Sequence, residues 1–257
     1  MADWDPTTYL QFADERSRPF LELTARVAAP APASVIDLGC GPGRLTAGLA
    51  TRWPTASIEG VDSSAAMIEA AEEYASEQVR FRLADITDWR PDRAVDVIVS
   101  NATLQWVPGH RGLLPRLVAS LADGGELAFQ VPGNFGEPSH VLLHELAADP
   151  RFAESTRGLP RPEAFDPATY LADLAALGCR VDAWETTYLH VLPGPDPVFR
   201  WISGTGARPV LQALPDVLRE EFVAEYKALL RDAYPEQPFG TLMPFRRIFV
   251  VAQREVS

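Results

Sequence analysis

Cysteine is scarce in this chain of 257 residues, which contains two, Cys40 and Cys179. They lie far apart in the sequence, and neither has a histidine or a second cysteine nearby at the spacing of metal ligands. The sequence therefore supports neither a disulfide framework nor a zinc site, and we expect no bound metal.

Long apolar runs are also missing. No stretch approaches the ~20 apolar residues that a transmembrane helix requires. Residues 1–5 do not have the character of a signal peptide. We expect a cytoplasmic protein that does not associate with a membrane.

Basic residues are outnumbered in this sequence. The chain has 23 lysines and arginines against 35 acidic residues, which gives a formal net charge of -12. Because nucleic-acid binding relies on a clustered basic surface, we expect no nucleic-acid partner, although a small local basic pocket can still bind an anion. We favour a small-molecule substrate and a monomeric chain.

The chain does contain a regular alternation of short apolar runs and helical patterns between residues 34 and 131. Such alternation is typical of βαβ units that feed a parallel sheet. It predicts a doubly wound α/β fold with a mostly parallel, seven-stranded sheet and a small helical cap. The expected strands are residues 35–38, 58–61, 79–83, 95–100, 126–131, 181–192 and 245–253.

Helical patterns lie between and after these strands. They cover residues 44–52, 64–75, 111–121, 138–148, 167–177 and much of 195–238. We expect three regions: an N-terminal helical lid (1–28), a cofactor-binding core (29–136), and the remainder of the sheet (137–257) with a helical substrate cap at about 195–240. A cap inserted between the last two strands lies beside the carboxyl ends of the sheet, where ligands bind in this class of fold.

The strongest motif is a glycine-rich turn directly after the first strand. Gly39, Gly41 and Gly43 let the backbone bend sharply and approach a ligand, and the helix that starts near Arg44 presents free N–H groups. A dinucleotide site would have its third glycine where Arg44 stands, so the sequence disfavours pyrophosphate binding. The turn predicts a site for a nucleoside-bearing cofactor.

This turn, preceded by Asp37, resembles motif I of the class I S-adenosylmethionine-dependent methyltransferases, and the resemblance covers roughly residues 34–132. It implies that S-adenosylmethionine is the cofactor and that Asp37, Gly39 and Gly41 hold its methionine moiety. It also implies that Asp85 accepts the adenine amino group while Ile86 stacks on the ring. The alternative for Asp85 is an ordinary turn residue.

Asp62 ends the second strand about 20 residues past the turn, where an acid can accept hydrogen bonds from both ribose hydroxyls. Its alternative role is a helix N-cap, which a neighbouring serine could also fill. Met67, in the first turn of the next helix, either covers the adenine or packs in the core. The remaining cofactor-binding residues that we predict in the core are Cys40, Ser63, Asn101, Ala102 and Trp106.

Methyl transfer from a sulfonium is an in-line displacement, so the protein mainly aligns the reactants and excludes water. A carboxylate acceptor is already ionised at neutral pH and needs no general base. We therefore predict no catalytic residue. We expect the four histidines on the surface or on helices, with His140 the one to test: His110, His140, His144 and His190.

A polycarboxylate acceptor requires cations in a concave site, above all arginine, whose planar fork matches a carboxylate. The candidates are Arg200 beside Trp201, and the pair Arg246 and Arg247 in the last strand. At most one residue of that pair faces the site, because side chains alternate along a strand. The alternative for each arginine is a surface ion pair.

A closer resemblance, to the trans-aconitate methyltransferases, runs over most of the chain. It rests on WDPxxYLxF at 4–12, RSRP at 16–19, VIDLGCGPG at 35–43, LQW at 104–106 and QVPGN at 130–134. It implies methylation of one carboxylate of trans-aconitate to a monomethyl ester, and a lid formed by Trp4, Tyr9 and Arg16. As the alternative, Trp4 and Tyr9 pack the N-terminal helix on the core. The substrate-binding residues that we predict are Gln130, Pro132, Asn134, His140, Arg200, Trp201 and Arg246.

Three other functions compete with this interpretation. A methyltransferase for a fatty acid, phenol or amine would be favoured by an apolar, arginine-poor pocket in the 195–245 region. A nicotinamide-dependent oxidoreductase is disfavoured by the glycine spacing and by the lack of a recognisable Tyr-Lys pair. A noncatalytic binding module with the same fold is the third alternative.

Overall fold

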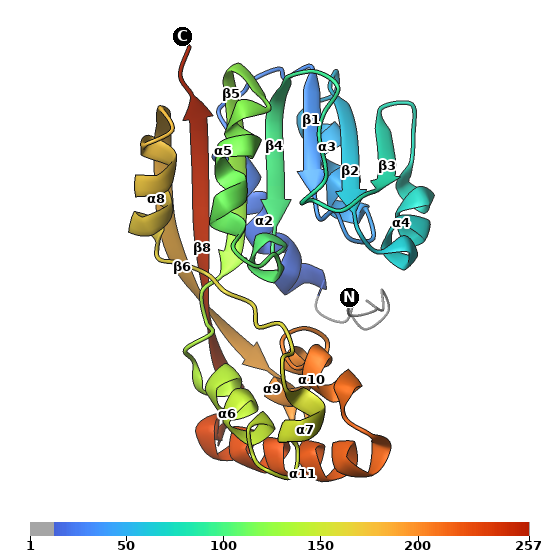
Figure 1. The fold of residues 1–257 in the computed structure, drawn as a ribbon, viewed down its shortest axis with the longest axis vertical. Coiled ribbons are helices and arrows are strands. Elements are labelled where there is room, and N and C mark those ends of the chain that lie inside the picture. Colours follow the sequence, from blue (N-terminus) through green and yellow to red (C-terminus); the bar gives the residue numbers. More distant parts are fainter. Residues whose placement is uncertain (1–12, 257) are drawn as a thin grey trace. The chain divides into compact units, whose positions relative to one another are not determined.

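The computed structural model describes residues 13–256, which form two compact units (Figure 1). The sheet unit consists of residues 13–131, Phe165–Thr186 and 247–256, and the helical unit consists of Pro132–Ala164 and Thr187–Arg246. The three-region division expected from the sequence remains a prediction. No helix within the described range is long and apolar enough to cross a bilayer.

The sheet unit is built on strands in the order β3-β2-β1-β4-β5-β8-β6. Pairing is parallel between β3 and β2, β2 and β1, β1 and β4, and β4 and β5, whereas β8 runs in the opposite direction (Figure 1). The bounds are β1 (Ser34–Leu38), β2 (Ser57–Asp62), β3 (Val79–Leu83), β4 (Val95–Asn101), β5 (Leu121–Pro132), β6 (Cys179–Leu192) and β8 (Gly240–Arg254). The doubly wound, mostly parallel fold predicted from the sequence is confirmed.

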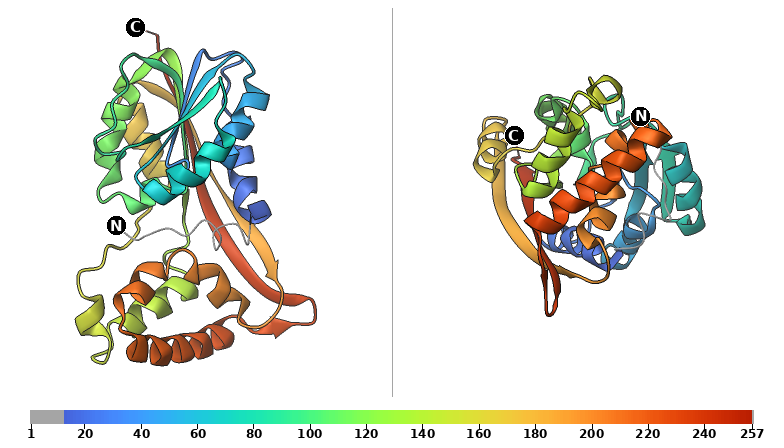
Figure 2. Two further views of the ribbon diagram at one scale, coloured as in Figure 1. Left: turned by 90° about the vertical axis from the view of Figure 1, so that its right-hand side faces the viewer. Right: turned by 90° about the horizontal axis from the view of Figure 1, so that it is seen from below.

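Helices cover both faces of this sheet (Figure 2), as its central strands require. All five residues of β1 are buried, and such a strand needs apolar cover on each side. Helices α2 (Ala13–Ala25) and α3 (Arg44–Arg52) lie against one face, and α5 (Leu114–Ala119) and α8 (Pro167–Ala175) lie against the other. The turns at the carboxyl edge of the strands stay uncovered by these helices.

Some boundaries differ from the sequence expectation for local reasons. The helix expected at 64–75 is α4 (Ala65–Ala71) followed by a 3-10 turn, Glu72–Tyr74. The helix expected at 111–121 begins as a 3-10 turn, His110–Leu113, and α5 follows with a proline in its first turn. The sheet has eight strands rather than seven, because the two residues of β7 (Glu236–Gln237) form a hairpin with β8.

The helical unit packs helices of four to 18 residues around aromatic side chains. Its helices are α6 (Pro138–Ala147), α7 (Ala153–Thr156), α9 (Pro197–Ser203), α10 (Arg208–Ala213) and α11 (Asp216–Ala233). Phe222 of α11 meets Phe152 edge-on with ring centroids 5.1 Å apart. Trp201 of α9 is buried between His190 and Phe245, at centroid distances of 4.7 and 5.6 Å. Proline in the first turn of α6, α9 and α10 supports these short helices, because its fixed φ suits a helix start.

Candidate functional site

The glycine turn after β1 has three glycines in the left-handed region of φ, for three different reasons. A Cβ on Gly39 (φ 80°) would lie 2.0 Å from Thr103 Oγ1, so the chain after β4 packs directly on the turn. A Cβ on Gly43 (φ 79°) would lie 2.7 Å from Ala71 and Phe81, so this glycine allows helix packing. A Cβ on Gly41 (φ 56°) would meet nothing within 4 Å. Gly41 therefore presents bare backbone, which a ligand can approach closely.

Asp37 lies beneath this turn rather than on its surface. Its side chain is 3% exposed, and Oδ2 accepts a hydrogen bond of 2.6 Å from Thr46 Oγ1 of α3. Burial raises the pKa of Asp37 to about 7, opposed by the Thr46 hydrogen bond and reinforced by the charge of Asp62. Contact of Asp37 with the methionine moiety remains a prediction. In the structure, Asp37 is buried and links β1 to α3 through its hydrogen bond with Thr46.

Asp62 links the turn to the carboxyl end of β2. One carboxylate oxygen accepts the Gly41 N–H and the other accepts the Ser64 N–H, each at 2.9 Å. Burial raises the pKa of Asp62, although these backbone hydrogen bonds oppose the shift. The helix N-cap of α4 is Ser64, whose side chain accepts from Met67 N, and Ser63 is exposed. The structure thus assigns the capping role to Ser64 and leaves the carboxylate of Asp62 beside Gly41.

Asp85 and Ile86 follow β3, as expected from the sequence. Asp85 Oδ1 accepts hydrogen bonds from Thr87 N and Thr87 Oγ1 at 2.8 and 2.7 Å, so this acid also stabilises its own turn. Ile86 is 8% exposed and Met67 is 4% exposed, which shows that both side chains pack largely inside the sheet unit. Their proposed contacts with adenine remain predictions.

The turn after β4 holds a non-glycine residue in the left-handed region, because Ala102 has a φ of 53°. Two hydrogen bonds fix it: Ala102 N donates to Gln130 O at 2.9 Å, and Gln105 Nε2 donates to Ala102 O at 2.6 Å. Asn101 Oδ1 is buried and has no hydrogen-bond partner among the described residues. Trp106 closes this turn and is half-buried.

The turns after β1, β2, β3 and β4 lie at one edge of the sheet, because the four strands are parallel neighbours. This edge offers bare backbone at Gly41, carboxylate oxygens at Asp62 and Asp85, and an unsatisfied acceptor at Asn101. A ligand that carries hydroxyl and amino groups can satisfy these acceptors. The residues at the edge therefore fit a nucleoside-bearing cofactor such as S-adenosylmethionine.

The predicted substrate residues fall in both units. Gln130 is fully buried in the sheet unit, where its Oε1 accepts from Arg247 Nη1 at 3.2 Å. In the helical unit, Arg246 donates to Gly133 O at 3.3 Å, and Arg200 is exposed and donates to Pro193 O. Both of these arginines therefore donate to backbone carbonyl groups, and their role in substrate binding stays a prediction.

The other substrate candidates in the helical unit are mostly buried. His140 is 4% exposed, and burial lowers its pKa to about 4, with the charge of His144 as a smaller cause. Asn134 is 1% exposed, and within the described chain neither polar atom of its amide has a partner. Trp201 belongs to the aromatic core, and Pro132 is half-buried. Of these, Asn134 retains unsatisfied polar atoms that a ligand could bind.

The predicted lid cannot be placed. Trp4 and Tyr9 lie outside the described residues, and Arg16 falls in α2 at a position whose side chain is not described. The lid therefore remains a prediction.

The expectation that the histidines lie on the surface or on helices is wrong for His190, which is part of β6 among aromatic rings. His110 begins a 3-10 helix, where it is fully buried with its Nε2 2.7 Å from the Tyr170 hydroxyl. His140 and His144 are on α6, as expected. The two cysteines are both free and buried, and the described residues contain no group of three side chains suited to a metal ion.

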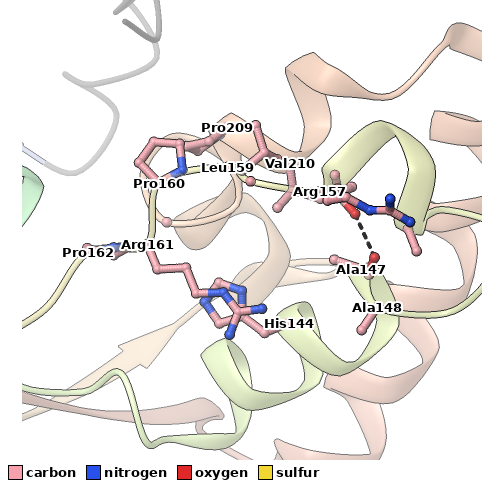
Figure 3. A pocket seen from close by; sticks show the side chains of 14 residues that line it. His144, Ala147, Ala148, Arg157, Leu159, Pro160, Arg161, Pro162, Pro209 and Val210 are labelled. Carbon is pink, nitrogen blue, oxygen red and sulfur yellow. Dashed lines mark hydrogen bonds between the residues drawn. The ribbon is translucent and has the colours of Figure 1, made fainter.

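The sequence did not reveal a cavity of about 300 Å³ in the helical unit (Figure 3). It is lined by residues of α6, α7 and the loop that follows, together with Gly206, Pro209 and Val210. His144, Arg157 and Arg161 are its ionisable side chains. The contributing segments are distant in sequence, and the one available signal was the pair of arginines in the proline-rich stretch 157–162.

Comparison with known proteins identifies the family. The family described as a methyltransferase domain matches residues 35–125, which span β1 to the first part of β5. The trans-aconitate 2-methyltransferase of Streptomyces coelicolor is 52% identical over 98% of this chain and 86% of its own length. The chain belongs to the trans-aconitate 2-methyltransferase family. The member from Rhodococcus jostii is 51% identical over 97% of this chain and 99% of its own length.

As a member of the trans-aconitate 2-methyltransferase family, the chain is a methyltransferase that uses S-adenosylmethionine as methyl donor, as the motifs predict. This excludes the nicotinamide-dependent oxidoreductase and the noncatalytic module. Among solved structures, the geranyl diphosphate C-methyltransferase of Streptomyces coelicolor matches with a TM-score of 0.53 and 18% identity, over 96% of this chain and 82% of that chain. That likeness confirms the fold alone.

Proposed function

We propose that this enzyme transfers a methyl group from S-adenosylmethionine to one carboxylate of trans-aconitate, or of a closely related small polycarboxylate. The products are a monomethyl ester and S-adenosylhomocysteine. The observation that carries the proposal is the identity of about half of all positions, over nearly the whole chain, with enzymes named for this reaction. A cytoplasmic location and a monomeric state remain predictions.

The reaction requires no acid–base catalysis by side chains, because a carboxylate is already ionised at neutral pH. When bound, the cofactor supplies an electrophilic methyl group on a sulfonium sulfur. The acceptor carboxylate would take this methyl group in its ionised form, so no residue of the chain would need to move a proton. The contribution of the chain is to orient both reactants and to exclude water. Gly41, Asp62, Asp85 and Asn101 would hold the donor at the edge of the sheet.

The test is incubation with isotopically labelled S-adenosylmethionine and a panel of di- and tricarboxylic acids, followed by mass analysis. We expect one labelled methyl group on trans-aconitate and much slower transfer to saturated or shorter acids. Asp62→Ala serves as the control for turnover at this site. Labelling of none of the acids, with labelling of a fatty acid, phenol or amine instead, would refute the carboxylate acceptor.

Among the alternatives, a methyltransferase for an apolar acceptor needs a pocket that is poor in arginine. The cavity in the helical unit contains two arginines and a histidine, which favours an anionic acceptor. A phenol or amine would additionally require a base or a desolvated lone pair. We therefore retain the polycarboxylate as the proposed acceptor class.

A further inference from the structure

The cavity in the helical unit collects positive charge in a chain that is acidic overall. Two arginines, Arg157 and Arg161, are among its 14 lining residues together with the ionisable His144, and none of the 14 is Asp or Glu. The remaining walls are largely apolar, with Leu159, Val210 and several prolines. Its volume of about 300 Å³ is at the lower end of the roughly 300 to 1,000 Å³ that ligand pockets occupy. The lining suits a small anion with a hydrocarbon skeleton.

The two arginines of this cavity differ from their neighbours in how they are bonded. Arg151, earlier on the same segment, forms ion pairs with Asp149, Glu221 and Glu225. Arg157 and Arg161, by contrast, form no ion pair with any residue that the structure describes. An arginine without a protein carboxylate keeps its planar fork available for a carboxylate of a ligand.

The cations are distributed over the cavity rather than gathered at one point. Figure 3 shows the Arg161 side chain extending toward His144 of α6, whereas Arg157 lies on another side of the cavity. Arg161 is close enough to His144 for its positive charge to lower the pKa of the imidazole, in addition to the larger effect of burial. An anion bound beside Arg161 would offset this positive charge and so favour the protonated form of His144.

We propose that this cavity binds a small polycarboxylate, with Arg161 and His144 holding one carboxylate and Arg157 contacting a second. The inference rests on the proposed function, because the acceptor is itself such an acid. A second polycarboxylate that acts as an effector would bind through the same chemistry as the acceptor. The effect of the variants on turnover distinguishes an acceptor from an effector. The apolar walls then accommodate the carbon skeleton.

The test uses the full-length protein saturated with S-adenosylhomocysteine, titrated by calorimetry with trans-aconitate and with propane-1,2,3-tricarboxylate. We expect Arg161→Gln to weaken binding by about tenfold or more, and Arg157→Gln by a few-fold, through loss of charge-assisted hydrogen bonds. Arg161→Lys should retain part of the affinity, since it keeps the charge. Arg93→Gln is the matched control, because it removes the same charge from an exposed arginine of the sheet unit and should change nothing.

Turnover then identifies the ligand. If KM for trans-aconitate rises in proportion to the loss of affinity, the bound acid is the acceptor; if KM stays constant, it is an effector. Unchanged binding in the Arg157→Gln/Arg161→Gln double variant, or no binding of either acid to the wild type, would overturn the proposal. Unchanged S-adenosylhomocysteine affinity shows that each variant is folded. A wild type that binds these acids but methylates none would refute the proposed function while leaving this inference standing.

Discussion

The two units differ in whether their charged side chains are bound to other groups of the chain. The sheet unit holds acids against backbone N–H groups: Glu126 Oε2 accepts from Ala28 N at 2.7 Å, and Asp62 accepts from Gly41 and Ser64. The helical unit leaves Arg157 and Arg161 without ion pairs around a cavity. The carboxylates of Glu126 and Asp62 are therefore held by backbone hydrogen bonds before any ligand binds. The guanidinium groups of Arg157 and Arg161 stay available for a carboxylate of a ligand.

If the cavity binds an acid as proposed, the cofactor and this acid are recognised by different means. A cofactor bound at the sheet edge meets groups whose positions depend on strand geometry, so mutations there should affect folding and binding together. An acid bound in the cavity would meet the exposed side chains of Arg157 and Arg161, so mutations there should affect binding alone. Four substitutions test the comparison, in order of expected effect.

Gly39→Ala should have the largest effect. The added Cβ would overlap Thr103 at a position where φ is 80°, so we expect a loss of about 3 kcal/mol or more in the free energy of unfolding, together with loss of S-adenosylhomocysteine binding. Chemical denaturation and calorimetry measure both. Gly48→Ala is the control, because Gly48 lies in α3 with no atom near its Cβ position, and it should stabilise the chain by up to about 1 kcal/mol. Equal effects of the two substitutions would contradict the tight packing of the turn.

Asp37→Asn should change how stability depends on pH. Because its pKa is about 7 in the folded chain against an ordinary 3.8, folded Asp37 keeps a proton that the unfolded chain has released between these values. Its contribution to stability is therefore present at low pH and is lost as pH rises toward 7. Asparagine cannot ionise, so the variant should gain on the order of 2 kcal/mol relative to the wild type between pH 5 and pH 8. Urea unfolding at both pH values measures this, and parallel pH profiles would show that the carboxylate is not perturbed.

Asp62→Ala should weaken S-adenosylhomocysteine binding by about 1 to 3 kcal/mol, because it removes the predicted ribose contact and frees the N–H groups of Gly41 and Ser64. Titration calorimetry gives the value. Asp88→Ala, which removes an exposed acid from the same unit, should leave the affinity unchanged. If both variants bind like the wild type, Asp62 does not contact the cofactor.

Tyr226→Phe should have the smallest effect, confined to the stability of the helical unit. Its buried hydroxyl donates to Ser139 O at 2.5 Å, and losing this hydrogen bond should cost about 1 kcal/mol. The affinity for S-adenosylhomocysteine should not change. Tyr74→Phe removes an exposed hydroxyl and should be neutral in both measurements. A loss of cofactor binding in Tyr226→Phe would contradict the inference that the helical unit can change without affecting the cofactor site.

Much of the sheet unit was predictable because its signals are local. A strand, a glycine turn and the next helix are consecutive in sequence, so β3 and α3 have the predicted bounds, Val79–Leu83 and Arg44–Arg52. The position of Asp62 at the end of β2 followed from the same pattern. Sequence alone could not show that Asp37 is enclosed beneath the turn, because that depends on the packing of Thr46.

The helical unit was less predictable because its interactions join distant segments. Arg200 was selected for its aromatic and glycine-rich surroundings, yet in the structure it bonds to a backbone carbonyl at Pro193. The arginines of the cavity stand in a loop with no periodic pattern, and the cavity closes through Gly206 and Val210, far along the chain. The four-residue helix α7 is likewise too short for a periodic signal.

The left-handed backbone at Ala102 has a consequence for directed evolution of this enzyme. Few side chains tolerate that region, and β-branched residues tolerate it least. In a saturation library at this position, glycine, asparagine and aspartate should be enriched among active clones, and valine, isoleucine and threonine should be depleted. Because the Gln105 side chain donates to the Ala102 carbonyl, whereas Gln130 contributes only its backbone carbonyl, selection in such a library should couple position 102 to position 105 rather than to position 130.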